Sequence, residues 1–286
     1  MSRIVYVNGD YVPEEEARVS IFDRGFLFAD GVYEVTSVLD GKLIVFAGHA
    51  ALLERSLGEI EMASPVSGAE LAEVFRELVR RNSLTEGMVY LQITRGADKD
   101  RDFDCPAPEL VPPTVLAFTQ TKNIIGSQAA KTGISVITIE DLRWARRDIK
   151  TVQLLYPVLG KKMAKDQGKD DAWMVEDGVV TEGTSNNACI VRGGRIITRD
   201  LSEKILHGIT RKAVLAFARE AQMKVEERPF TVEEAREADE AFITSASTFV
   251  MPVTEIDGAT IGDGKPGPVA TRLREIYIEE SRKSAV

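Results

Sequence analysis

One stretch of the chain reads Arg143-Trp144-Ala145-Arg146-Arg147-Asp148-Ile149-Lys150, and it follows the most strongly predicted strand, residues 134–139. Nearby cations disfavour the charged form of a lysine, so the lysine at the end of this stretch should lose its proton readily and act as a nucleophile. Taken alone, the same run is more typical of a solvated basic turn. The remainder of the chain is needed to choose between these interpretations.

The elements before this stretch indicate an α+β protein rather than a doubly wound one, because hairpins are followed by helices and then by strands again. A hairpin is predicted around Asn8-Gly9. We expect strands at 32–39, 43–46, 88–94 and 114–119, and helices at 50–62 and 71–79. Residues 97–113 are polar and rich in proline, which predicts a long functional loop.

Residues 120–132 lack a clear period and are interpreted as an interdomain linker. The predicted organisation is therefore an N-terminal domain at 1–119, this linker, and a C-terminal domain at 133–286. In the second domain we expect a helix at 154–166, a helix from Thr210 through Ala221 and a last helix that Pro268 opens. Its strands are predicted at 134–139, 172–175, 179–180, 188–191, 195–198, 225–229 and 241–244.

Composition excludes several kinds of site. The chain has 286 residues, a formal net charge of −9 and no basic stripe, which argues against nucleic acid as a partner. No apolar run approaches the length of a membrane helix. With only two cysteines and two histidines, disulfide frameworks, zinc sites and most catalytic triads are disfavoured, and a reducing cytosol is expected.

Three further segments could hold a ligand. Glu182 lies between a strand and a run of small polar residues, Gly183 to Asn187, although an ordinary strand–turn segment would look the same. Leu206-His207-Gly208-Ile209-Thr210-Arg211 opens an amphipathic helix, whose start can bind an anion or simply carry an N-cap at Thr210. Thr244-Ser245-Ala246-Ser247-Thr248 ends a strand and could complete a phosphate site or form a plain polar loop.

These parts match the needs of one cofactor. Pyridoxal phosphate takes a lysine on its aldehyde carbon, a carboxylate at its pyridine nitrogen and a helix start at its phosphate.

By contrast, Gly262-Asp263-Gly264-Lys265-Pro266-Gly267 fits a dinucleotide fingerprint only formally, because no βαβ unit and no later acidic ribose ligand accompany it. We interpret it as a surface loop before the last helix.

The order and spacing of these motifs resemble class IV (fold type IV) pyridoxal-phosphate aminotransferases over essentially the whole chain. The segments that carry the resemblance are Asp23–Phe26, Asp30–Val35, Arg147–Lys150, Thr181–Asn187, Gly208–Arg211 and Ile256–Gly267. Gly-Val-Tyr-Glu-Val and Arg-Arg-Asp-Ile-Lys are most similar to D-amino-acid aminotransferases. The resemblance implies a smaller N-terminal α/β domain, a larger β-rich pseudo-barrel domain that binds the cofactor, and a cytoplasmic homodimer.

The resemblance also implies residue roles. Lys150 would bind the cofactor covalently and carry the proton, and Glu182 would keep the pyridine nitrogen protonated. The other cofactor contacts would come from Leu206, Ile209, Thr210, Ser245 and Ala246. Tyr33, Val35, Arg101 and Phe103 would bind the substrate, with Arg101 reaching in from the loop of a neighbouring subunit.

Two positions depart from the family pattern. The family usually has His-x-x-Arg where this chain has His49-Ala50-Ala51-Leu52, so the phosphate arginine is absent and Arg55, three residues further on, is its candidate replacement. D-amino-acid aminotransferases commonly have Arg-x-His in the long loop, whereas this chain has Arg101-Asp102-Phe103.

The predicted reaction is ping-pong transamination from a D-amino acid to a 2-keto acid. Alternatives are an (R)-amine or branched-chain amino-acid aminotransferase, since Phe103 is apolar, and aminodeoxychorismate lyase. A catalytically silent binding protein on the same fold is disfavoured, because a scaffold needs neither Lys150 nor Glu182.

Overall fold

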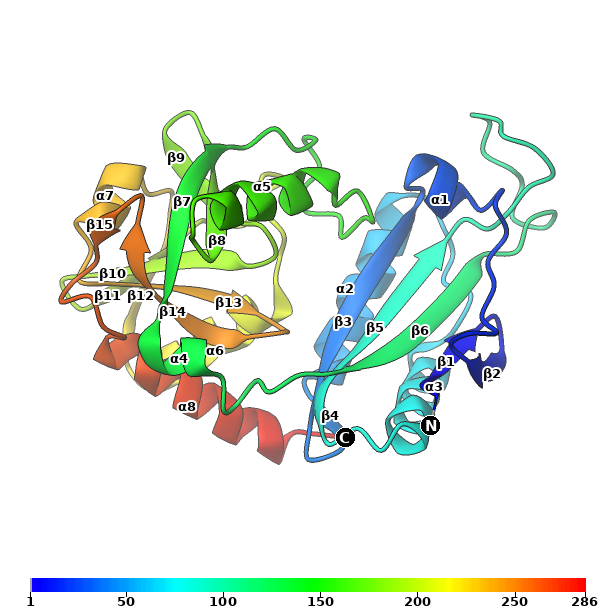
Figure 1. Cartoon of the computed structure of the whole chain (residues 1–286), viewed down its shortest axis with the longest axis horizontal. Helices are drawn as coiled ribbons and strands as arrows, with labels where there is room; N and C mark the ends of the chain where they lie inside the picture. The colour runs from blue at the N-terminus through cyan, green and yellow to red at the C-terminus, as the bar shows by residue number, and fades with distance from the viewer. Residues whose placement is uncertain (1) are drawn as a thin grey trace. The chain divides into compact units, whose positions relative to one another are not determined.

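The computed structural model describes residues 2–286 and divides into two compact units (Figure 1). Among the described residues, the first unit comprises residues 2–123, Ile149–Gln153 and Ser284–Val286, and the second comprises Ile124–Asp148 and Leu154–Lys283. Residues 149–153, which the sequence analysis grouped with the C-terminal domain, thus pack with the first unit. The expected linker at 120–132 holds the end of one strand and a short helix, α4 (Gln128–Thr132).

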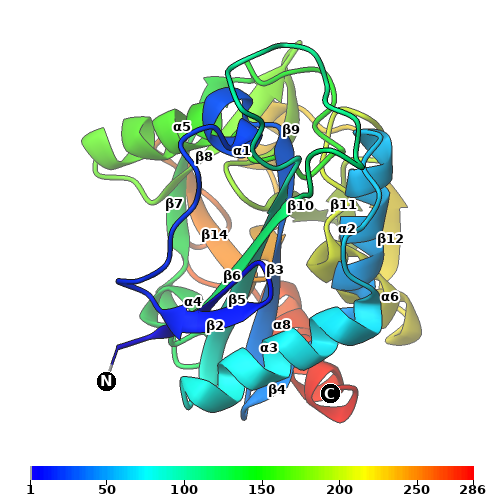
Figure 2. The ribbon, with the colours of Figure 1, turned by 90° about the vertical axis from the view of Figure 1, so that its right-hand side faces the viewer.

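The first unit is an antiparallel sheet with helices on one face. Its strand order is β2-β1-β6-β5-β3-β4. The strands are β1 (Ile4–Val7), β2 (Asp10–Pro13), β3 (Gly31–Leu39), β4 (Lys42–Leu43), β5 (Glu86–Thr94) and β6 (Thr114–Thr121). The helices are the short α1 (Arg24–Phe28), α2 (Phe46–Glu59) and α3 (Gly68–Arg81). Figure 2 shows α2 and α3 beside this sheet.

Local sequence explains these elements. Asn8 and Gly9 both have positive φ angles, as the predicted tight hairpin between β1 and β2 requires. A capping box of Ser67 and Glu70 begins α3. The apolar faces of α2 and α3 meet the sheet in a core that includes Leu53, Leu57, Phe75, Leu78, Val32, Val89 and Leu91.

One predicted strand of this unit is wrong. The segment 43–46 was expected to return as a strand, but β4 ends at Leu43 and α2 begins at Phe46. Val45 takes a left-handed conformation with φ of 52°, which turns the chain from strand into helix. A β-branched residue disfavours that conformation, so its side chain type gave no signal for the turn.

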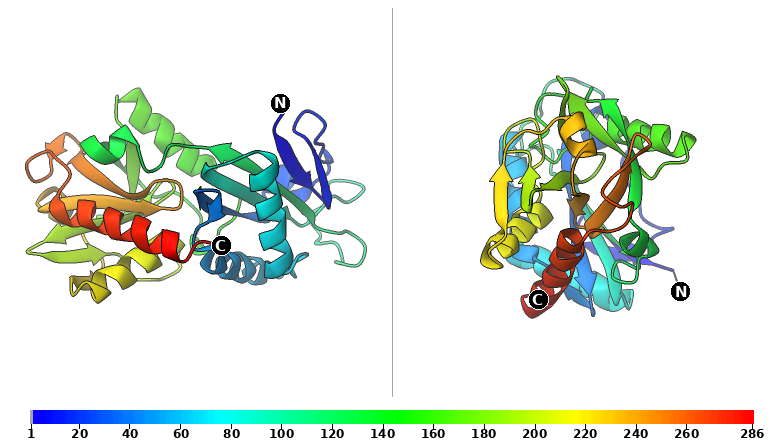
Figure 3. Two further views of the ribbon diagram at one scale, coloured as in Figure 1. Left: turned by 90° about the horizontal axis from the view of Figure 1, so that it is seen from below. Right: turned by 90° about the vertical axis from the view of Figure 1, so that its left-hand side faces the viewer.

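The second unit is built on a nine-stranded mixed sheet that curls on itself (Figure 3). Its strand order is β12-β11-β10-β13-β14-β7-β8-β9, with β15 paired to β14. The strands are β7 (Ile134–Glu140), β8 (Asp171–Glu176), β9 (Val179–Gly183), β10 (Asn187–Arg192), β11 (Arg195–Thr198), β12 (Lys224–Glu227), β13 (Glu240–Ser245), β14 (Phe249–Ile256) and β15 (Ala259–Thr260). The helices are α4, α5 (Leu155–Asp166), α6 (Ile209–Glu220), α7 (Val232–Arg236) and α8 (Pro268–Lys283).

The central strand β14 was not predicted. Pro252 lies inside it, and proline is unusual within a sheet because it cannot donate to the ladder. The structure accommodates Pro252 because it pairs with Phe242 of β13 on one side, while pairing with β7 on the other side begins only at Val253. The loop at 262–267 precedes α8, as the sequence analysis expected.

Candidate active site

Lys150 lies along the open edge of β3. The strand β4 covers only Val38 and Leu39 at that edge, so the other end of β3 is available for pairing. The segment around Lys150 fills it: the Tyr33 amide donates to the Lys150 carbonyl at 3.0 Å, and Val32 pairs with Thr151. The Lys150 amide in turn donates to Ser56 Oγ of α2 at 3.3 Å. Backbone contacts on both sides therefore fix the position of the lysine.

The predicted substrate residues Tyr33 and Val35 share one face of β3. Alternate side chains of a strand point to the same side, so these two residues project away from the apolar core that Val32 and Val38 join. The Lys150 ammonium lies 4.3 Å from the centroid of the Tyr33 ring. The first unit thus brings the predicted catalytic lysine and a predicted substrate residue into contact.

An aromatic row continues from Tyr33 across the sheet. Tyr33 stacks on Tyr90 of β5, with 5.7 Å between ring centroids, and Tyr90 stacks on Phe118 of β6 at 4.9 Å. Burial, with a smaller contribution from Tyr33, raises the pKa of Tyr90 to about 12, and its hydroxyl donates to Gln92. Tyr90 therefore stays neutral near neutral pH and supports the Tyr33 ring. The sequence analysis did not identify it, because its contact with Tyr33 depends on strand register.

Glu34 and His49 hold the opposite face of β3 to helix α2. Both side chains are buried, and His49 Nδ1 lies 3.0 Å from Glu34 Oε1. This contact between a strand and a helix leaves Tyr33 and Val35, the neighbours of Glu34, on the other face of the strand. His49 is therefore a packing residue of the first unit.

Arg101 and Phe103 lie on the exposed loop between β5 and β6. The Arg101 guanidinium lies 5.0 Å from the ring centroids of both Phe28 and Phe103, and these two rings are themselves 5.2 Å apart. Arg101 makes no hydrogen bond or ion pair within residues 2–286. The loop thus presents an arginine held by aromatic rings with its donors available to a ligand.

Leu52 and Arg55 lie three residues apart on α2 and differ in burial. Leu52 is buried and lies one helical turn before Ser56, the residue that contacts the Lys150 amide. Arg55 is partly exposed, and its guanidinium lies 3.5 Å from Glu59. Leu52, where the family pattern has arginine, is thus one turn from the residue that contacts the Lys150 amide, and Arg55 has an ion-pair partner of its own.

Glu182, the penultimate residue of β9, is a buried carboxylate. It accepts hydrogen bonds from Arg143 Nη1 at 2.6 Å, Asn187 Nδ2 at 2.9 Å and the Leu206 amide at 3.0 Å. Burial raises the pKa of Glu182, and the opposite charge of Arg143 acts against this rise. Three donors and a cation compensate for the cost of burying the charge. The segment that the sequence predicted as a possible ligand site therefore contains a carboxylate that hydrogen bonds hold in place.

Arg143 connects Glu182 to a second acid. Its guanidinium also binds Asp141 at 2.7 Å, and Arg147 lies 3.4 Å from the same carboxylate. Burial alone would raise the pKa of Asp141, but hydrogen bonds and charge from Arg143, with Thr181 and Arg147, lower it below its usual value. Sequence reasoning noted Arg143 only as one of several cations and did not connect it with Glu182.

The three arginines that precede Lys150 in the sequence are all paired with carboxylates. Arg143 pairs with Asp141 and Glu182, Arg147 with Asp141 and Glu176, and Arg146 with Asp148. The reason proposed for an activated lysine was therefore wrong, because sequence proximity does not show which carboxylates the topology brings to each arginine.

The helix α6 begins at Ile209, and Gly208 is its N-cap. The prediction that Thr210 caps this helix is wrong, since Thr210 is its second residue and no side chain caps the first turn. A side chain at Gly208 would collide with Asn187, because an added Cβ would lie 2.2 Å from Asn187 Oδ1. This close approach lets Asn187 bind both Glu182 and the Leu206 carbonyl, each at 2.9 Å.

The turn after β13 contains Ser245 and Ala246. The Ser245 hydroxyl lies 2.7 Å from that of Thr248. Next to this turn, the Thr244 hydroxyl is buried and has no hydrogen-bond partner among residues 2–286. An uncapped helix start and a buried hydroxyl without a partner are what a bound phosphate would satisfy.

The second unit therefore brings together Glu182 and Leu206, which are in direct contact, and also carries Ile209, Thr210, Ser245 and Ala246. The first unit brings together Lys150 and Tyr33. Asn187 is a site residue to which the sequence analysis gave no role, although it lies in the polar run after Glu182.

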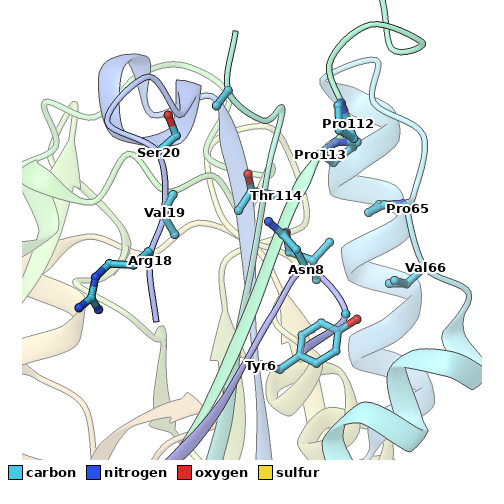
Figure 4. Close-up of a pocket in the computed structure, with 13 residues that line it drawn as sticks. Tyr6, Asn8, Arg18, Val19, Ser20, Pro65, Val66, Pro112, Pro113 and Thr114 are labelled. Carbon is cyan, nitrogen blue, oxygen red and sulfur yellow. The ribbon is translucent and has the colours of Figure 1, made fainter. Parts of the chain in front are cut away.

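A separate pocket in the first unit contains none of the predicted site residues (Figure 4). It lies near the β1–β2 hairpin and the ends of the long loop, and its lining includes Tyr6, Asn8, Arg18, Pro112 and Thr114. Within residues 2–286, no helix has the length and apolar character needed to cross a membrane, and no cluster of three metal-binding side chains is found.

Known proteins resemble the chain over almost its whole length. The family model "Amino-transferase class IV" matches residues 31–256. The chain is 38% identical to a D-alanine aminotransferase of Staphylococcus haemolyticus over 282 residues, 98% of this chain and 99% of that protein. It is 39% identical to a D-alanine aminotransferase of Bacillus licheniformis over 285 residues, with the same shares covered.

Solved structures agree on the fold. A branched-chain amino acid aminotransferase of the archaeon Thermoproteus uzoniensis, solved with norvaline, is 26% identical, with a TM-score of 0.87 over 98% of this chain and 94% of that one. A branched-chain amino acid aminotransferase of Escherichia coli, 24% identical, gives a TM-score of 0.92 over 98% and 95%. The fold is the two-domain fold of these enzymes, as the sequence predicted, and the chain belongs to the class IV aminotransferases.

Proposed function

We propose that this protein is a pyridoxal-phosphate-dependent transaminase that moves an amino group from a D-amino acid, of the D-alanine or D-glutamate type, to a 2-keto acid in a ping-pong reaction. Full-length similarity to D-alanine aminotransferases supports the substrate class. The observation that carries the assignment to this chain is the contact between the Lys150 amine and the Tyr33 ring at 4.3 Å.

The residues present fit the cofactor. Glu182 is a buried carboxylate, α6 starts without a side-chain cap, and the Thr244 hydroxyl is buried without a partner among the described residues. When bound, pyridoxal phosphate supplies an electron-withdrawing ring that stabilises negative charge on the substrate Cα. Glu182 would bind its pyridine nitrogen, Leu206 would pack on the ring, and Ile209, Thr210, Ser245 and Ala246 would bind the phosphate.

Lys150 would do the proton chemistry with its amine. The β3 edge and Ser56 fix its backbone, so only the side chain has to move between the cofactor carbon and the substrate Cα. Glu182, held by Arg143 and Asn187, would keep a proton at the pyridine nitrogen. Hydrogen bonds fix the Lys150 backbone within the first unit and the Glu182 carboxylate within the second. Each group would therefore need little reorganisation during the reaction.

Substrate recognition would involve Tyr33, Val35, Arg101 and Phe103. An arginine with available donors binds a carboxylate through two parallel hydrogen bonds, which makes Arg101 the candidate for the α-carboxylate. Phe103, where relatives have histidine, would replace one polar contact by the aromatic ring that supports Arg101.

We also propose that the protein acts as a homodimer in the cytoplasm, in which Arg101 serves the site of the neighbouring subunit. The exposed position of Arg101 and Phe103 supports this arrangement. The unpaired cysteines Cys105 and Cys189 are consistent with a reducing compartment.

A branched-chain amino-acid aminotransferase is the second candidate, because a solved structure of such an enzyme matches the chain at 26% identity. The two candidates differ in the hand of the substrate. Half-reactions of the holoenzyme with D-alanine, D-glutamate, L-leucine, L-valine and an (R)-amine, followed through the absorption of the cofactor, separate them. We expect the D-amino acids to react fastest. Faster reaction with L-leucine or L-valine would overturn the D-specific assignment and favour the second candidate.

A further inference from the structure

Arg24 is a buried arginine that holds the long loop between β5 and β6. Its side chain is 7% exposed. Its Nη1 donates to the carbonyl of Asp102 at 2.8 Å and to that of Asp104 at 3.1 Å, and its Nε donates to Asp30 at 2.8 Å. A single guanidinium therefore links the loop to a carboxylate at the end of α1. The carbonyls that it binds belong to the residues on either side of Phe103.

The beginning of the same loop is held by the same helix. The Arg24 amide donates to the Gly96 carbonyl at 2.8 Å, and Asp23 pairs with Ala97 through a β-bridge. The Asp23 carboxylate also accepts the Thr94 hydroxyl at 2.9 Å. Arg101 thus lies between two anchored points of the loop, both of which depend on the first residues of α1.

The ring of Phe28, the last residue of α1, contacts both Arg24 and Arg101. The Arg24 guanidinium lies 4.8 Å from its centroid and that of Arg101 lies 5.0 Å from it. The Asp104 amide donates to Asp102 Oδ1 at 3.1 Å in an Asx turn, and the ring of Phe103, within this turn, lies 5.0 Å from the Arg101 guanidinium. Guanidinium–aromatic contacts of this kind are favourable but not strongly directional, so the loop backbone must fix where Arg101 points.

We infer that Arg24 is a positioning residue for substrate binding: it sets the place of Arg101 by fixing the carbonyls of Asp102 and Asp104. This inference rests on the proposed function, in which Arg101 binds the α-carboxylate. A bidentate contact requires the guanidinium to be in register with the carboxylate, so a shift of the loop weakens carboxylate binding and leaves the proton chemistry at Lys150 unchanged.

Arg95 provides a matched control. It binds the same carboxylate, with its Nε 2.9 Å from Asp30 Oδ2, and its Nη2 donates to the Ile60 carbonyl after α2 at 2.8 Å. Its hydrogen bonds go to Asp30, Ile60 and Glu61 and not to residues 101–104. Arg95→Lys therefore weakens the same network around Asp30 without releasing the loop, and it tests whether any effect of Arg24 is merely structural.

The experiment is steady-state kinetics of the holoenzyme with D-alanine for Arg24→Lys, Arg95→Lys, Arg101→Ala and the double variant of Arg24 and Arg101. Lysine keeps the charge but lacks the planar fork that lets Nε bind Asp30 while Nη1 binds the two carbonyls. We expect Arg24→Lys to raise KM for D-alanine by about ten- to a hundredfold, the range that misplacement of a binding group by about 1 Å produces. Its kcat should change less than KM, and Arg95→Lys should leave KM near the wild-type value.

The double variant decides the mechanism. If Arg24 acts through Arg101, adding Arg24→Lys to Arg101→Ala raises KM no further, because coupled residues are not additive. Three outcomes would each overturn the inference. The effects of Arg24→Lys and Arg101→Ala on KM could be additive, or Arg24→Lys and Arg95→Lys could change KM equally. Finally, both Arg24→Lys and Arg24→Gln could fail to fold while Arg95→Lys folds. If Arg101→Ala leaves KM for D-alanine unchanged, the role of Arg101 in the proposed function fails as well. Absence of D-alanine turnover in the wild type would remove the proposed substrate class itself.

Discussion

Arg143 Nη1 lies 2.6 Å from Glu182 Oε1 in the interior of the second unit, and the same guanidinium binds Asp141. The arginine therefore shares its charge between two carboxylates. Asn187 and the Leu206 amide bind the other oxygen of Glu182, so hydrogen bonds hold the carboxylate at both of its oxygens.

Glu182→Gln should fold and yet lose most of the activity. Asp141 still balances Arg143 in this variant, but a neutral amide cannot stabilise a proton on the pyridine nitrogen. We expect kcat to fall by at least about 10²–10³-fold, the usual cost of removing one preorganised electrostatic contact. Circular dichroism checks the fold, and single-turnover kinetics measure the loss. Turnover close to the wild type would show that another acid serves the ring.

Lys150→Ala should abolish both turnover and the covalent attachment of the cofactor, because no other amine of the first unit occupies the β3 edge beside Tyr33 among the described residues. Borohydride treatment followed by mass spectrometry detects the attachment. The variant should keep its fold, since the contacts that fix this segment are made by its backbone. A variant that still traps cofactor and turns over normally would contradict the assignment of Lys150.

Leu52→Arg should tighten cofactor binding. Leu52 lies on the face of α2 that carries Ser56, next to the Lys150 backbone, so an arginine there restores the family pattern close to the lysine. A charge-assisted hydrogen bond contributes about 1.5–3 kcal/mol, or about ten- to a hundredfold in the dissociation constant. Equilibrium dialysis measures the change.

Arg55→Ala is the companion variant for the same question. Arg55 has Glu59 as a partner on the partly exposed side of α2. If its removal releases the cofactor, the phosphate contact has moved along the helix. If neither Arg55→Ala nor Leu52→Arg changes the affinity, the backbone amides at Ile209 and Thr210 and the Ser245–Ala246 turn suffice for phosphate binding.

Asp30 should make stability depend on pH. Burial alone would raise the pKa of Asp30, but hydrogen bonds and charge from Arg95 and Arg24 lower it below its ordinary value of 3.8. A carboxylate with a lowered folded-state pKa stabilises the fold above its unfolded pKa, and this contribution is lost as the pH falls through the folded-state pKa. Asp30→Asn should therefore reduce the free energy of unfolding at pH 7 by about 1.5–3 kcal/mol.

The difference between Asp30→Asn and the wild type should shrink as the pH falls below about 4, because the unfolded chain then binds a proton at Asp30 that the folded carboxylate binds only at lower pH, and it should vanish below the folded-state pKa. Urea unfolding at a series of pH values measures it. A difference that stays constant with pH would show that Asp30 contributes through packing rather than through its charge.

The sequence by itself determined the family and most of the elements, and it predicted several candidate site residues. Turn residues such as Asn8-Gly9 and the apolar spacing of α2 and α3 act locally, over a few residues, so they can be recognised without a structure. Lys150, Glu182 and Arg101 were predicted because the motifs around them are short and contiguous. The strand β14 was missed because Pro252 argues against a strand. Whether a sheet tolerates a proline depends on how the neighbouring strands pair, and the sequence does not show this pairing.

Tertiary structure decided which groups meet. The contact of Lys150 with Tyr33 depends on residues 149–153 filling the open edge of β3, although 117 positions separate the two residues in the sequence (150 − 33). The arginines before Lys150 form ion pairs with Asp141, Glu176 and Glu182, so their closeness in the sequence did not justify the argument for an activated lysine. Arg24 binds the backbone of Asp102 and Asp104, and backbone acceptors carry no sequence signal. Electrostatic and hydrogen-bond contacts act over a few ångströms in space, so only the fold determines which of the many possible pairs are formed.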